Sequence, residues 1–193
     1  MKLHLRIVAG SVRRRKVVCE AGPQLRPTPQ RVREALFSIL GNAVPDRPFI
    51  DVFAGSGIVG LEALSRGASS ALFLERDATL ARDIERHARE FGFADRSRVS
   101  RADVYGWAET WQPPAEPVTV FLSPPFHDIH EHSEDLLLLI ERLQRTMPAD
   151  SVVVLQSEAR SPLDNHPAFA AWDTRKYGRN QLLVWVKDDA IPA

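Results

Sequence analysis

Apolar positions along the chain follow two different periods. Four short apolar runs predict strands, at residues 49–53, 71–75, 118–122 and 151–155, and residues 98–101 predict a further short strand. Residues 58–66, 78–91 and 133–148 place apolar side chains at helical spacing, and Ser133 is predicted to cap the last of these helices. Strands that alternate with amphipathic helices predict a mostly parallel α/β sheet with both faces covered.

Both ends of the chain add to this pattern. Residues 1–26 predict a short extended or hairpin segment. Thr28 suits the N-cap, and Pro29 the first position, of a helix that Gly41 can end. Residues 174–187 predict a closing antiparallel hairpin. We therefore expect one domain, with an N-terminal extension and helix at residues 1–48 and a seven-stranded core at residues 49–193.

The composition is ordinary for a soluble globular protein, with 44% apolar and 26% charged residues among 193. No apolar run is long enough to span a membrane. Arg6 interrupts the N-terminal segment, which is therefore unlike a signal peptide. Cys19 is the only cysteine, so no internal disulfide can form. We expect a cytoplasmic protein that acts as a monomer without membrane contact.

The net charge of zero hides an uneven distribution. Residues 1–48 carry ten Lys or Arg against three Asp or Glu, a net charge of +7, so the remainder carries −7. A basic segment on an acidic body favours a nucleic-acid partner over a merely solvated surface. The basic residues expected to contact it are Arg13, Arg14, Arg15, Lys16, Arg26, Arg31 and Arg33.

A glycine-rich turn follows the first core strand. Gly55, Gly57 and Gly60 match the spacing of nucleotide-binding loops, and Glu75 ends the next strand twenty residues after Gly55. Glycines allow close backbone approach, and the acid can accept hydrogen bonds from ribose hydroxyls. The pattern predicts an adenosine-containing cofactor, either NAD or S-adenosylmethionine. Asp51, in the strand just before the glycine loop, favours the cationic cofactor over a pyrophosphate.

Two later strands end at further candidate residues. Asp103 can accept a hydrogen bond from an adenine amino group, or it can cap a helix that starts at Val104. The fourth core strand runs into Ser123-Pro124-Pro125-Phe126. Two prolines stiffen the chain and leave carbonyl oxygens to accept from an exocyclic amine, and the ring can stack on a flipped base.

These motifs together resemble a known family. Asp51-x-Phe53-x-Gly55-Ser56-Gly57 with Ser123-Pro124-Pro125-Phe126 is similar to the nucleic-acid amino-methyltransferases. The resemblance narrows to the RsmD family, which methylates guanine N2 in 16S ribosomal RNA, through four further segments: Arg6-Ile7-Val8-Ala9-Gly10, Leu25-Arg26-Pro27-Thr28, residues 31–37 and residues 60–68.

The resemblance implies a Rossmann-like class I methyltransferase that binds S-adenosylmethionine. The implied cofactor contacts are Asp51, Phe53, Gly55, Ser56, Gly57, Glu75, Arg76, Asp103, Val104 and Thr28, with residues 28–37 closing over the cofactor. The implied substrate is small-subunit rRNA or an assembling 30S particle, held partly by the basic N-terminal residues. The family usually has Asp or Asn where this chain has Ser123.

Two other kinds of protein also fit the sequence. An NAD-dependent oxidoreductase could use the same fold, and a catalytically degenerate RNA-binding or ribosome-assembly protein could keep it. The His127–His132 stretch has a metal-like composition, but its irregular spacing favours a polar loop and no metal. Trp107 and Trp111 are expected in the core, and Arg179 sits at a turn that either contacts RNA or is an ordinary hairpin tip.

Overall fold

One seven-stranded sheet forms the centre of the molecule. In the computed structural model, which describes residues 2–20, 22 and 25–188, its strand order is β5-β4-β3-β6-β7-β9-β8. The first five strands in this order are parallel, and β9 is antiparallel to both its neighbours. The bounds are β3 (Pro48–Val52), β4 (Ser70–Leu74), β5 (Ser97–Ser100), β6 (Thr119–Leu122), β7 (Val152–Glu158), β8 (Asp173–Tyr177) and β9 (Asn180–Val186). This confirms the predicted sheet and its antiparallel closing hairpin.

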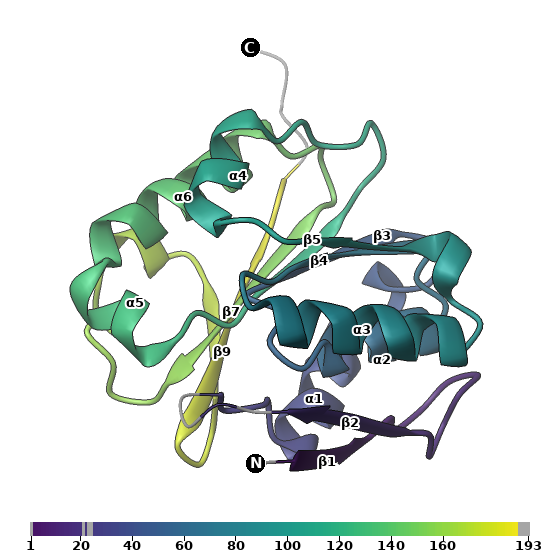
Figure 1. The fold of residues 1–193 in the computed structure, drawn as a ribbon. Coiled ribbons are helices and arrows are strands. Elements are labelled where there is room, and N and C mark those ends of the chain that lie inside the picture. Colours follow the sequence, from purple (N-terminus) through teal and green to yellow (C-terminus); the bar gives the residue numbers. More distant parts are fainter. Residues whose placement is uncertain (1, 21, 23–24, 189–193) are drawn as a thin grey trace.

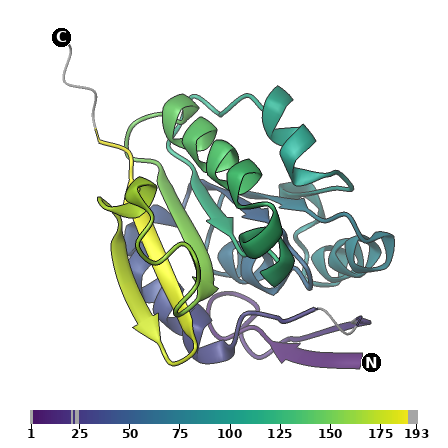
Figure 2. The same cartoon turned by 90° about the vertical axis from the view of Figure 1, so that its left-hand side faces the viewer.

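Helices cover both faces, as Figures 1 and 2 show. One face carries α1 (Gln30–Leu40), α2 (Ile58–Ser65) and α3 (Ala78–Glu90); the other carries α4 (Val104–Thr110), α5 (Phe126–Glu131) and α6 (Ser133–Thr146). Each layer has its own core, because alternate strand residues face opposite sides. Short 3-10 turns lie at Gly41–Ala43, Ala94–Arg96 and Pro167–Phe169. Within the described residues, no helix is long and apolar enough to cross a membrane.

Three local expectations were wrong. Residues 126–131 form a helix rather than a loop, since Pro125 starts it and the buried Asp128 and Ile129 anchor it. Thr28 does not cap α1, because Pro29 occupies that position and the Thr28 hydroxyl instead donates to Gln156 Oε1 at 2.8 Å. Ser133 is the first residue of α6 and makes no cap.

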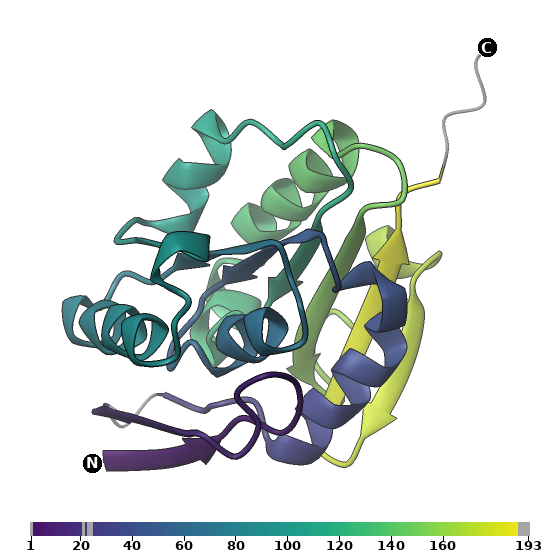
Figure 3. The ribbon, with the colours of Figure 1, turned by 90° about the vertical axis from the view of Figure 1, so that its right-hand side faces the viewer.

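The N-terminal residues form a separate two-stranded sheet packed against α3. β1 (Lys2–Arg6) and β2 (Lys16–Glu20) pair antiparallel, and Figure 3 shows them below the helices. The buried His87 of α3 accepts from the Val18 amide at 3.0 Å, and Arg86 donates to the Val18 carbonyl. The basic extension is therefore docked on the core and not a free arm.

The loop between β1 and β2 packs against the end of α2 through Gly10. The Ser11 amide donates to the Ser65 carbonyl at 2.7 Å, and the Ser65 hydroxyl donates to Ala9. A Cβ added at Gly10 would lie 1.9 Å from the Ser65 carbonyl oxygen, and its φ is +87°. Only glycine allows this close approach.

Arg33 departs from the expectation that it contacts RNA. The residue is 1% exposed and its Nε donates to Glu62 Oε2 at 3.2 Å. Its other nitrogens donate to the Thr28 and Arg6 carbonyls, both at 2.8 Å. Burial lowers the pKa of this guanidinium, and the paired Glu62 acts against that shift. Arg33 therefore joins α1, α2 and β1 inside the fold and is unavailable to phosphate.

Replacing Arg33 should destabilise the protein without a direct effect on RNA affinity. Arg33→Met leaves Glu62 with Arg66 alone and two carbonyls without donors, so we expect a loss of about 3 kcal/mol in the free energy of unfolding. Urea unfolding measures it. The matched control is Arg31→Met, an exposed neighbour on α1. A loss below about 0.5 kcal/mol for Arg33→Met, typical of surface substitutions, would contradict the buried role.

Candidate active site

The candidate site lies where the strand order reverses. The chain proceeds outward from β3 to β4 and β5, then returns to pair β6 with the other side of β3. Val52 is in register with Leu122, and the Ser123 amide donates to the Val52 carbonyl at 3.3 Å. The glycine loop and Ser123 therefore leave the sheet side by side, at the position where open α/β sheets bind ligands.

Packing as well as ligand approach requires the glycines of the loop. Phe53, Gly55 and Gly57 all have positive φ, and Gly57 precedes α2 directly. A Cβ at Gly57 would lie 2.6 Å from the Ile84 side chain. A Cβ at Gly55 would lie 2.8 Å from Leu25 Cδ1, so a side chain of the N-terminal segment covers this part of the loop.

Two buried carboxylates lie behind the loop. Asp51, 1% exposed, accepts from the Gly60 amide at 2.9 Å. Glu75 is 8% exposed and accepts from the Gly55 amide at 2.7 Å and the Asp77 amide at 2.8 Å. Burial raises the pKa of both acids. For Asp51, burial and the charge on Glu75 together raise the pKa to about 8, although the hydrogen bond from Gly60 acts against that shift.

This acid pair can hold a cationic group. Among the described residues, no Lys or Arg hydrogen-bonds to Asp51 or Glu75, although the nearby Arg76 charge lowers the pKa of Glu75. A positive ligand would stabilise the ionised form of both acids, whereas a pyrophosphate would disfavour it. Each Glu75 oxygen keeps capacity to accept a further hydroxyl.

The residues that the sequence predicted to contact adenine follow β5. Asp103 accepts from the Gly106 amide at 2.9 Å, which confirms that it caps α4. Val104 is buried in the core behind it, and Ser56 is also buried, while Arg76 is exposed. Asp103 is exposed and its carboxylate retains acceptor capacity, so the cap does not conflict with an adenine contact.

Residues 123–126 form the opposite side of the site. The Pro125 carbonyl accepts from the Asp128 amide at 3.0 Å inside α5, so it is not the free acceptor that the sequence predicted. No described residue donates to the Pro124 carbonyl, and Ser123 is half-buried. Phe126 is 59% exposed, and its ring lies 4.1 Å from that of His130. An exposed ring next to one carbonyl and one hydroxyl can present a flat surface and acceptors to a base.

Sequence reasoning missed some residues near the site. Tyr105 of α4 donates to the buried Asp128 of α5 at 2.7 Å, and its ring packs edge-on against Phe53. Burial raises the pKa of Tyr105, and the bond to Asp128 raises it further. Gln156 accepts the hydrogen bond from the Thr28 hydroxyl. It comes directly after Leu155, which is in register with Leu122. A glutamine directly after four apolar strand residues was the available signal.

The basic residues fall into two groups. The first group lies near the site. Arg179, at the tip of the β8–β9 hairpin, lies beside the C-terminal end of β7, where the Ala159 amide donates to the Arg179 carbonyl, and Arg31 is exposed in the first turn of α1. Arg15 instead reaches the opposite end of α3, donating to the Glu90 carbonyl and covering the Phe91 ring. The thirteen residues of α3 span about 20 Å, which separates Arg15 from the site.

The histidines of α5 pair with nearby acids. His127 lies 3.1 Å from Glu131, and His132 lies 3.5 Å from Asp135. Within the described residues, no three His, Cys, Asp or Glu side chains are placed to hold a metal ion.

Comparisons with known proteins agree with this geometry. The model of the family described as conserved hypothetical protein 95 matches residues 5–186. Ribosomal RNA small subunit methyltransferase D of Escherichia coli is 32% identical over 85% of this chain and 80% of its own length. The Haemophilus influenzae protein of the same name is 33% identical over 84% of this chain and 83% of its own length.

A solved structure shares the fold. The putative methyltransferase yhhF from Escherichia coli superposes with a TM-score of 0.76 at 28% identity. The match covers 96% of this chain and 98% of that one.

Asp51 should make the stability of the ligand-free protein depend on pH. Its folded pKa of about 8 exceeds its ordinary 3.8, so the protonated form stabilises the fold fully below pH 3.8, and that contribution is lost as pH rises to about 8. Asp51→Asn keeps the acceptor for Gly60 and cannot ionise. Thermal unfolding should show wild type losing about 2–4 kcal/mol more than the variant between pH 5 and 8. Parallel pH profiles would contradict a buried, neutral Asp51.

Proposed function

The chain belongs to the RsmD family of ribosomal RNA methyltransferases, and from this premise we propose that it methylates the exocyclic N2 of a guanine in small-subunit rRNA, using S-adenosylmethionine. The observation that carries the proposal is the buried acid pair beside residues 123–126 at the reversal of strand order. It favours a cationic methyl donor and argues against NAD, whose pyrophosphate would face two carboxylates.

The chain's own residues would hold the cofactor in three ways. Glu75 would accept from ribose hydroxyls, and Asp51 would compensate the positive charge across the loop formed by residues 53–57. Asp103 would accept from the adenine amino group at the start of α4. Thr28 is already fixed to Gln156, so the segment that carries Leu25 over Gly55 is positioned to cover the cofactor.

The chemistry needs little more than positioning. Bound S-adenosylmethionine supplies an electrophilic methyl group. Ser123 Oγ and the Pro124 carbonyl would accept the hydrogens of the target amine and orient its lone pair for in-line displacement. Phe126 would stack on the base, which must be flipped or unpaired to reach the site. No strong base is required, since the methylated ammonium loses its proton readily.

Ser123 in place of the family's usual Asp or Asn still leaves a working acceptor. Its hydroxyl is half-buried at the end of β6, and the Pro124 carbonyl beside it is independent of the side chain at 123. These two acceptors favour an active enzyme over a degenerate RNA-binding or assembly protein that kept only the fold.

The proposed RNA surface excludes Arg33 and spans both basic groups. Arg26, Arg31 and Arg179 would contact RNA next to the site, and Arg13, Arg14, Arg15 and Lys16 would contact it beyond the far end of α3. The separation suits an extended rRNA segment or a 30S particle as substrate. A single buried cysteine, Cys19, fits a monomer in the reducing cytoplasm.

Substitutions at Ser123 and Phe126 test the chemical step. Ser123→Ala removes one of two acceptors and should lower the single-turnover rate while cofactor affinity stays near normal. Phe126→Ala should cost more, because base stacking is worth about 1–3 kcal/mol. Ser123→Asp restores the family's residue and should remain active. Methyl transfer to unmodified small ribosomal subunits, with the product base mapped, measures each effect.

Two results would count against this assignment. Full activity in both Ser123→Ala and Phe126→Ala would place the active site elsewhere. An inactive native chain with an active Ser123→Asp variant would support the degenerate protein instead.

The basic residues beyond the far end of α3 should affect RNA affinity and not the rate of methyl transfer. Replacing Arg13, Arg14 and Lys16 with Ser removes three exposed cations and should weaken RNA binding and flatten its salt dependence. The slope should fall by roughly 0.7–0.9 for each phosphate that these side chains neutralise in the wild type. Because these residues lie far from Phe126, KM should rise with kcat unchanged. Replacing Arg31 and Arg179 is the comparison near the site. An unchanged salt slope in the first variant would identify its arginines as a solvated surface.

A further inference from the structure

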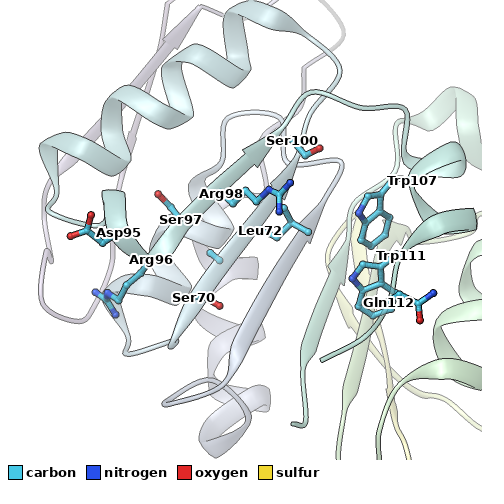
Figure 4. Close-up of a pocket in the computed structure, with 11 residues that line it drawn as sticks. Ser70, Leu72, Asp95, Arg96, Ser97, Arg98, Ser100, Trp107, Trp111 and Gln112 are labelled. Atoms are coloured by element: carbon cyan, nitrogen blue, oxygen red, sulfur yellow. The ribbon is translucent and has the colours of Figure 1, made fainter. Parts of the chain in front are cut away.

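A groove lies along the outer edge of the sheet, away from residues 123–126. It has a volume of about 490 Å³ and runs between the β4–β5 edge and the helix α4 (Figure 4). With seven residues, α4 is too short to cover this part of the sheet face. Leu72, on the floor of the groove, therefore stays half-buried although it lies inside a sheet.

Two tryptophans form one wall. Trp107 and Trp111 are four residues apart at the end of α4, and their rings lie 5.2 Å apart at 33°. The sequence predicted them in the core, and both do pack against the core on this face of the sheet, but they are only half-buried and also line the groove. Within the described residues neither indole N–H makes a hydrogen bond, so each keeps a free donor beside an accessible aromatic face.

A cation faces these rings from the edge strand. Arg98 of β5 is in register with Leu72 of β4, so both side chains leave the sheet on the groove side. Arg98 is exposed and makes no hydrogen bond or ion pair with any described residue. Figure 4 shows its guanidinium extending toward the tryptophans, with Ser97 and Ser100 on the same strand.

We propose that this groove binds unpaired nucleotides of the RNA substrate, with a base on the tryptophan wall and its phosphate at Arg98. The inference rests on the proposed function. Aromatic faces, the exposed guanidinium of Arg98 and serine hydroxyls suit a nucleotide, whereas a protein segment would need a more apolar floor than Leu72 and Ala71 provide.

The groove can serve the same RNA as the methylation site. The Glu75 amide donates to the Ser100 carbonyl, so the groove begins where the candidate cofactor site ends. β5 is separated from β6 by three strand spacings, about 14 Å. Nucleotides near the target base can therefore reach the groove, which would make it a second contact that adds affinity and not catalysis.

The test compares two substitutions at one tryptophan. Trp111→Leu keeps an apolar side chain but loses the aromatic face, and Trp111→Phe keeps a smaller face. Affinity for a fluorescent decaadenylate RNA should fall roughly tenfold in Trp111→Leu and much less in Trp111→Phe. Arg98→Ser should also weaken binding and reduce the salt slope by roughly 0.7. Arg175→Ser is the matched control, because it removes one arginine from the opposite edge strand, β8.

Methyl transfer separates this proposal from the function itself. The groove variants should raise the KM for small ribosomal subunits at unchanged kcat, with normal thermal unfolding. Unchanged RNA affinity in Trp111→Leu and Arg98→Ser, with an active wild type, would overturn the groove proposal alone. Self-association of the wild type that both variants abolish would assign the groove to a second copy and also overturn it. No methylation by the wild type, with RNA binding still weakened by the variants, would overturn only the proposed function.

Discussion

The parallel pairing of β3 with β6 is the constraint on which the candidate site depends. Because Val52 and Leu122 are in register, two segments seventy residues apart leave the sheet as neighbours. One segment brings the glycine loop and the other brings Ser123 and Pro124. Neither segment makes a site alone: the first offers a place for a cofactor, and the second offers acceptors for an amine.

The same pairing fixes the electrostatics of the site. Asp51 is the penultimate residue of β3 and Glu75 directly follows β4, so parallel register brings two acids to one edge of the sheet. The backbone amides of Gly60, Gly55 and Asp77 donate to three of their four oxygens but do not remove the cost of burial. Among the described residues no Lys or Arg hydrogen-bonds to either acid, so the pair favours a positive ligand and supports the proposed methyl donor more directly than the glycines do.

The sequence predicted what depends on local pattern. Apolar runs located the strands, and glycine spacing located the loop, because both signals lie within a few residues. The fate of Arg33 was not predictable in this way, since Glu62 lies 29 positions away and a charge count treats buried and exposed arginines alike. Thr28 was misplaced for the same reason: its partner Gln156 lies 128 positions away. Trp107 and Trp111 have helical spacing, but spacing cannot say that α4 ends before the sheet face is covered.

The positions of the charges bear on how the substrate binds. In the proposed mechanism, a base that flips toward Phe126 loses its stacking neighbours in the RNA, and contacts outside the proposed active site would offset this cost. Arg179 and Arg31 are near the site, the arginines before β2 lie beyond the far end of α3, and the tryptophan groove lies at the β5 edge. These contacts spread over the same domain in different directions. A short oligonucleotide could engage only some of them at once, whereas a folded rRNA segment could engage them together, which favours structured RNA over an isolated strand as the substrate.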